Sequence, residues 1–144
     1  MTGAGKVHHA TIMVTDLEKA DAFYGGVLEL PRTERPDFPS KGIWYEVGGV
    51  QIHLILAEKA DAPSPRHIAF AVGDLQAVLD RVGQLGLPIW NDIPLDGWIR
   101  KHCSDPFGNG IELLQRTGTP AYEDGGSTSY VSEEGRWRRG EQDG

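Results

Sequence analysis

The sequence has a single cysteine, few basic residues and no long apolar run, and each shortage excludes a class of protein. Cys103 has no partner for an internal disulfide, which excludes a disulfide scaffold and fits a reducing compartment. The 14 Lys and Arg stand against 21 Asp and Glu, and the net charge of −7 argues against nucleic acid as a partner. No apolar run reaches the length of a membrane span, and the first residues lack the apolar segment that is typical of a signal peptide. We therefore expect a cytoplasmic protein that binds neither nucleic acid nor membrane.

The sequence does contain two related segments, and each begins with a histidine. One segment reads HATIMVTDL from His9, and the other reads HIAFAVGDL from His67, 58 residues later. Further along, IHLI around His53 matches IELL around Glu112, with an offset of 59 residues. Two copies of one module therefore place an imidazole or a carboxylate at matching positions, which is one way to assemble a metal site.

The order of elements is the same in both halves and predicts an α+β fold of two paired βαβββ modules. Asp16 and Asp74 are typical helix N-caps, because each precedes apolar residues at helical spacing. We expect strands at 7–15, 28–34, 43–47 and 50–57 in the first module (7–58), and at 67–72, 88–91, 98–104 and 110–115 in the second (66–116). Residues 1–6 are expected to form an N-terminal extension and residues 117–144 a flexible tail.

Alternation along the strands assigns the candidate residues to one face. Apolar residues such as Ile12, Phe70 and Leu113 occupy the positions that suit helix packing, so the neighbouring positions belong to the opposite face. That face also carries apolar residues, which would be exposed unless the sheets curve around a cleft. Three imidazoles and one carboxylate suit Zn, Ni, Co, Mn or Fe better than Ca or Mg. The candidate ligands of one divalent metal ion are His9, His53, His67 and Glu112.

These residues lie in fragments that resemble the vicinal oxygen chelate superfamily, which includes glyoxalase I, bleomycin-resistance proteins and extradiol dioxygenases. The resemblance covers about residues 7–116 and is strongest in HATIMVTDLEKADAFY, HIAFAVGDL and DPFGNGIELL. It implies a curved mixed sheet cleft with a divalent metal bound by His9, His67 and Glu112. It also places His53 where glyoxalase I has a glutamate and methylmalonyl-CoA epimerase a glutamine.

The resemblance implies an enzyme that chelates vicinal oxygens of a small substrate, with Glu112 or His53 as the residue that transfers protons. Three protein ligands leave three of six positions open, enough for a catechol and dioxygen. If His53 also binds, two positions remain, which favours a glyoxalase-like lyase or isomerase, or a transferase. The alternatives are an extradiol-type dioxygenase using Fe(II) and a metal-free drug-binding protein of the bleomycin-resistance kind.

Four further residues are expected to border the cleft. Trp90 and Trp98 could contact an apolar or aromatic substrate, and Arg100 could bind an anionic group. His102 could line the cavity as an acid or base. The site can close within one chain, or two chains can exchange modules; a homodimer is expected in view of the small core.

Overall fold

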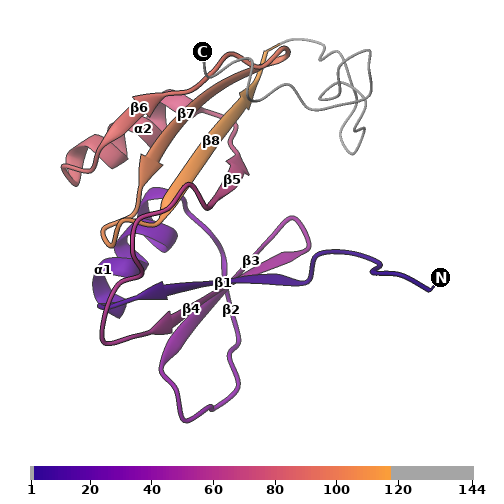
Figure 1. Ribbon diagram of the computed structural model, residues 1–144, viewed down its shortest axis with the longest axis vertical. Helices are drawn as coiled ribbons and strands as arrows, with labels where there is room; N and C mark the ends of the chain where they lie inside the picture. The colour runs from indigo at the N-terminus through magenta and orange to yellow at the C-terminus, as the bar shows by residue number, and fades with distance from the viewer. Residues whose placement is uncertain (1, 118–144) are drawn as a thin grey trace.

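The chain forms two four-stranded sheets that repeat the same order of elements (Figure 1). The computed structural model describes residues 2–117, so the expected tail lies outside the described residues except for Thr117. None of the helices in this part of the chain is long and apolar enough to cross a membrane.

The first module is built from six elements. They are β1 (His9–Val14), α1 (Leu17–Asp21), the π-helical segment η1 (Ala22–Val27), β2 (Arg32–Thr33), β3 (Gly42–Val47) and β4 (Val50–Leu56). The strand order is β1-β4-β3-β2, with β1 parallel to β4 and the other neighbours antiparallel.

The second module has the same topology. Its elements are β5 (His67–Ala71), α2 (Leu75–Gln84), β6 (Ile89–Asn91), β7 (Trp98–Ser104) and β8 (Gly110–Arg116). The order is β5-β8-β7-β6, and β5 runs parallel to β8. The predicted α+β class with two βαβββ modules is confirmed.

The two predicted N-caps are present, whereas one predicted strand is mostly absent. The Asp16 side chain accepts a hydrogen bond from the Lys19 amide at 3.0 Å, and Asp74 accepts one from Ala77 at 3.1 Å. The strand expected over 28–34 shortens to Arg32–Thr33. Glu29 has a φ of 54°, which breaks an extended chain, and Pro31 cannot donate to a ladder.

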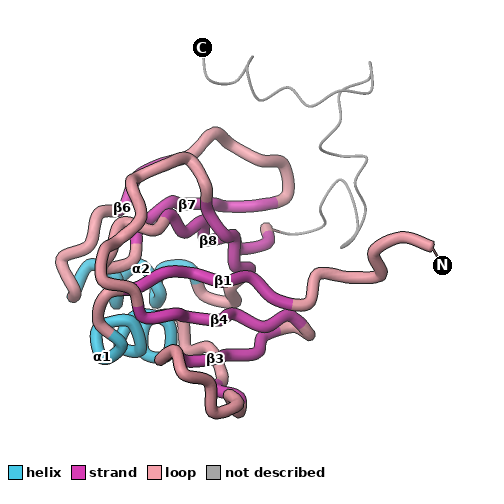
Figure 2. The backbone as a smooth tube through the Cα atoms, turned by 60° about the horizontal axis from the view of Figure 1, so that its bottom comes forward, coloured by secondary structure: helices cyan, strands magenta, loops and turns pink. Residues whose placement is uncertain are grey.

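The two modules share one core and are joined by hydrogen bonds. Figure 2 shows the helices of both modules gathered on one side of the molecule, and η1 lies against α2. The buried Tyr24 hydroxyl donates to Asp105 Oδ2 at 2.7 Å, and Asn109 Nδ2 donates to the Met13 carbonyl at 3.0 Å. Burial, followed by the Asp105 carboxylate, raises the pKa of Tyr24 well above its ordinary value. The phenol therefore stays protonated and keeps donating.

Gly42 lies so close to β4 that a side chain has no space. A Cβ at this position would be 2.1 Å from the Leu54 carbonyl oxygen, a backbone atom. We expect Gly42→Ala to lower the free energy of unfolding by about 1–3 kcal/mol, because β3 must move away from β4. Gly83→Ala is the control, since nothing lies within 4 Å of its Cβ and alanine favours a helix. Urea unfolding that finds Gly42→Ala as stable as the wild type would contradict the tight approach of β3 to β4.

Cys103 lies on the helix-covered side of the second sheet and is fully buried. Burial, and then the nearby Asp105, raise the pKa of its thiol to about 12. We expect the folded protein to resist alkylation by iodoacetamide at pH 8, because neither the thiolate nor access is available. The same reagent should modify the urea-unfolded chain fully, as followed by mass spectrometry. Rapid modification of the folded chain would show that this part of the core opens readily.

Candidate metal centre

The strands present the candidate ligands on the face that the helices do not cover. The alternate positions, such as Ile12, Leu54 and Ile111, are buried in the shared core. His53 and Glu112 are nevertheless buried as well, because neighbouring side chains on the open face cover them. Each module therefore carries ligand-type residues on the face of its sheet that the helices leave uncovered.

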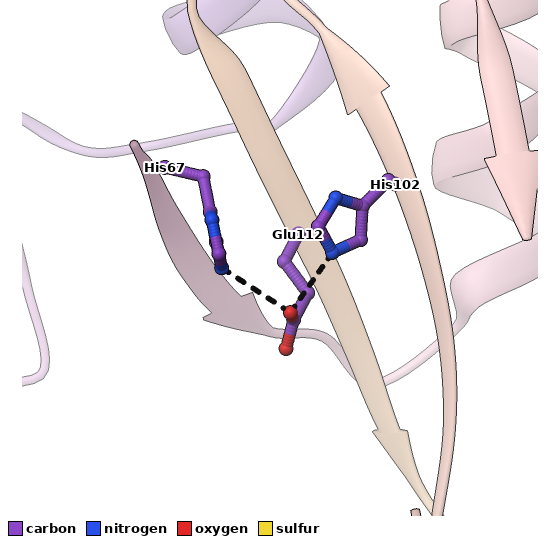
Figure 3. Close-up of side chains that lie close together, drawn as sticks. All are labelled: His67, His102 and Glu112. Carbon is purple, nitrogen blue, oxygen red and sulfur yellow. Dashed lines mark hydrogen bonds and ion pairs between the residues drawn. The ribbon is translucent and has the colours of Figure 1, made fainter. Parts of the chain in front are cut away.

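Three residues of the second module converge on that face: His67 of β5, His102 of β7 and Glu112 of β8 (Figure 3). Glu112 Oε1 lies 3.4 Å from His67 Nε2 and 3.0 Å from His102 Nε2. One donor atom from each residue lies within 4.8 Å of the other two, and this is the only such group within residues 2–117. Two imidazoles and a carboxylate are suitable donors for Zn, Ni, Co, Mn or Fe, so the donor set fits a divalent metal.

Two charged residues of the second module surround this group. Arg100 Nη1 lies 3.3 Å from Glu112 Oε1 and 3.2 Å from Asp92 Oδ2, while its Nε donates to the Ile93 carbonyl. Asp92 Oδ2 also lies 2.5 Å from His102 Nε2. Arg100 was predicted to line the cleft, whereas Asp92 was not, because its sequence neighbours carry no signal beyond the end of a strand. Together with Asp92 and Arg100, the three residues form a site with two carboxylates and one permanent cation.

The first module holds the other two predicted ligands in a stack of rings. The His53 ring lies between His9, with centroids 4.2 Å apart, and Trp44, with centroids 3.8 Å apart. His53 Nε2 pairs with Gln51 Oε1 at 2.8 Å. Burial, followed by the neighbouring His9, His8 and Arg35 side chains, lowers the pKa of His53, which favours its neutral form. The chain brings His9 and His53 together, but not into the group of His67 and Glu112.

The predicted cleft residues lie at different distances from this group. Trp90 on β6 lies opposite His102 on β7, and the centroids of their rings are 5.7 Å apart. Trp90 is 45% exposed. Trp98 lies at the start of β7, beneath the guanidinium of Arg116 at 5.3 Å. Trp90 and Arg100 therefore border the group of His67, His102 and Glu112, whereas Trp98 lies further from it, at the start of β7.

A cavity of about 300 Å³ adjoins the group on the side of His67. It lies between the first module and the start of the second, and the linker between the modules closes part of it. Its polar lining includes Thr11, Asp61, Arg66, His67 and Asn109. A small polar molecule would fit beside His67.

Both the sequence and the fold have known relatives. The sequence model of the Glyoxalase/Bleomycin resistance protein/Dioxygenase superfamily matches residues 6–113. No curated protein matches the chain.

Three solved structures illustrate the shared fold. A glyoxalase family protein from Bacillus anthracis is 24% identical with a TM-score of 0.70, over 81% of this chain and 99% of that one. A mutant of the fosfomycin resistance protein FosX from Listeria monocytogenes, in complex with Mn(II) and 1S,2S-dihydroxypropylphosphonic acid, is 20% identical with a TM-score of 0.68, over 81% and 95%. Lactoylglutathione lyase from Agrobacterium tumefaciens is 20% identical with a TM-score of 0.58, over 78% and 94%.

Proposed function

Since the chain belongs to the Glyoxalase/Bleomycin resistance protein/Dioxygenase superfamily, we propose that it is a divalent-metal-dependent enzyme acting on a small, oxygen-rich molecule. The observation that supports this most is the convergence of His67 and Glu112 on one open face. The Mn(II) in the FosX relative supports a metal at a site of this fold. A protein that only sequesters a drug has no need of such a donor set.

The proposed metal is held by His67 and Glu112, together with His9 from a first-module face. When bound, it supplies Lewis-acid stabilisation of negative charge on the substrate oxygens. Arg100 holds the Glu112 carboxylate in place, and Asp92 and the Ile93 carbonyl in turn fix Arg100. Glu112 is thereby positioned either to bind the metal or to move a proton at its carboxylate.

Among the reactions of the superfamily we propose a lyase, isomerase or transferase. With the predicted His53 as the fourth protein ligand, two of six positions remain for a chelating substrate and dioxygen is excluded. An extradiol-type dioxygenase is the second candidate, because two histidines and one carboxylate are also the ligands of non-haem iron oxygenases.

A panel of reactions separates these candidates. The metal-free protein is loaded in turn with Zn, Ni, Co, Mn or anaerobic Fe(II), and assayed with the hemithioacetal of methylglyoxal and glutathione, with an epoxide phosphonate, and with catechols on an oxygen electrode. We expect metal-dependent turnover of one of the first two substrates and no oxygen uptake. Rapid oxygen uptake with a catechol would establish the second candidate instead. A protein that stays inactive with every metal, and whose ligand binding is unchanged by His67→Ala, would establish a metal-free binding protein.

The separation of the predicted ligands on two sheets also bears on assembly. His9 and His53 lie on the first module, and a first-module face of a second copy can cover the second-module face of this chain. We therefore propose a homodimer with sites shared between the chains. Trp90, exposed beside His102, would be covered in such a dimer.

Light scattering should give twice the chain mass of 15.8 kDa. If sites are shared, refolding an equal mixture of His9→Ala and Glu112→Gln should restore about one quarter of the wild-type activity, because half of the dimers then contain one intact site of two. Each variant refolded alone is the control and should stay inactive. No recovery in the mixture would place the whole site within one chain.

A further inference from the structure

We propose that His102 is a metal ligand, so that the second module holds the ion through His67, His102 and Glu112 while His53 remains outside the coordination shell. This inference rests on the proposed metal centre and deepens it by naming the residue that completes it. It departs from the ligand set that the resemblance implies, in which His53 is the fourth candidate.

The separations between the donor atoms carry the first step. For an ion held at about 2.1 Å, two donors are about 3.0 Å apart at a right angle and about 3.4 Å apart at a tetrahedral angle. His102 Nε2 and His67 Nε2 lie 3.0 Å and 3.4 Å from Glu112 Oε1. Each histidine nitrogen therefore already has the spacing of a neighbouring ligand to the Glu112 oxygen, and the ligand atoms of the two histidines lie within 4.8 Å of each other.

The orientation of the His102 ring is the second step. Its Nε2 points at Glu112 Oε1 (Figure 3) and also lies beside Asp92 Oδ2. The His102 side chain is only 14% exposed. Asp92 is itself held by Arg100 at 3.2 Å. Asp92 and Glu112 therefore keep Nε2 turned toward the site instead of toward solvent, and an ion bound there would displace the contact between His102 Nε2 and Asp92.

The internal repeat supplies the third step, because it provides a comparison within the same chain. His102 lies opposite Glu112 in the second sheet, and Trp44 lies opposite His53 at the matching register position of the first. An indole has no lone pair to offer a metal, since its nitrogen only donates. Within residues 2–117, only the second module places three ligand-type side chains on its adjacent strands at these positions.

The surroundings of His53 are the fourth step. Its ring is stacked between His9 and Trp44, its Nε2 is paired with the amide of Gln51, and it belongs to no cluster of three ligand-type side chains within residues 2–117. If His102 takes the place expected for His53, the shell still contains four protein ligands once His9 joins. Two positions remain for a chelating substrate, so the proposed reaction class is unchanged.

Metal titration of matched glutamine variants tests this inference. Untagged full-length protein is stripped of metal, and Co(II) and Zn(II) are titrated by calorimetry into the wild type, His102→Gln and His53→Gln. We expect His102→Gln to weaken binding by at least about 100-fold, beyond the usual effect of residues behind the ligands, and His53→Gln by less than about threefold. Near-normal binding by His102→Gln, with or without a loss in His53→Gln, would overturn the inference and leave the proposed enzyme intact. A wild type that binds neither metal would overturn both.

A measurement on the wild type covers the case in which His102→Gln fails to fold. In ¹⁵N-histidine spectra, one equivalent of Zn(II) should shift the imidazole nitrogens of His67 and His102 together. A His102 resonance that does not respond while that of His67 shifts would exclude His102 from the shell.

Discussion

Replacing Glu112 by glutamine is expected to weaken divalent metal binding by more than about 100-fold, the largest effect of any single substitution in the proposed centre. The carboxylate oxygen that faces both His67 and His102 would be lost as an anionic donor. The substitution would also leave the Arg100 guanidinium, 3.3 Å from that oxygen, with Asp92 as its remaining anionic partner among residues 2–117. Calorimetric titration with Co(II) and Zn(II) measures the loss.

The control for this prediction is Glu46→Gln on β3, which removes the same charge from an exposed position. Its metal affinity should equal that of the wild type. The metal-free forms of both variants should also unfold cooperatively, so that a loss of affinity is not a loss of fold. Wild-type affinity in Glu112→Gln would remove the carboxylate from the proposed centre.

Replacing Asp105 by alanine is expected to lower the free energy of unfolding by at least about 3 kcal/mol, because several buried donors would lose their acceptor. The fully buried carboxylate accepts from the Tyr24 hydroxyl at 2.7 Å and from the Phe107 amide at 2.8 Å. It also accepts from the backbone and side-chain nitrogens of Asn109, at 2.9 and 2.7 Å. This carboxylate orders the turn before β8 and connects it to the first module, so its loss loosens both.

Two milder substitutions separate the contributions that Asp105→Ala removes together. Tyr24→Phe removes only the hydrogen bond from Tyr24 to Asp105 and should lower the free energy of unfolding by about 1–3 kcal/mol. Asp105→Asn keeps the volume but loses charge and one acceptor, so its cost should lie between those of the other two variants. Urea unfolding measures all three, and an Asp105→Ala protein as stable as Tyr24→Phe would show that the bonds within the turn contribute little.

Much of the fold could be predicted because its strands alternate cleanly and its two halves repeat. The period of two assigned Ile12 and Leu113 to the core and Glu112 to the open face, and the structure agrees. The strand over 28–34 failed because a left-handed Glu29 and the imide of Pro31 interrupt a segment whose composition resembles a strand.

The candidate site was predictable only in part. The parallel pairing of β5 with β8 brings His67 near Glu112, as the repeat suggested. The position of His102 opposite Glu112 follows from the short turn between Ser104 and Gly110, so counting back from that turn would have revealed it. Asp92 had no such signal, since its place beside His102 depends on how the chain after β6 folds back.

The metal content of untagged protein purified without chelator tests the central claim most directly. Elemental analysis of the wild type and His67→Ala should find one divalent ion per chain in the wild type and a large loss in the variant. A wild type without a bound ion that also fails to take one up, or an ion retained in full by His67→Ala, would contradict a metal centre on the second module.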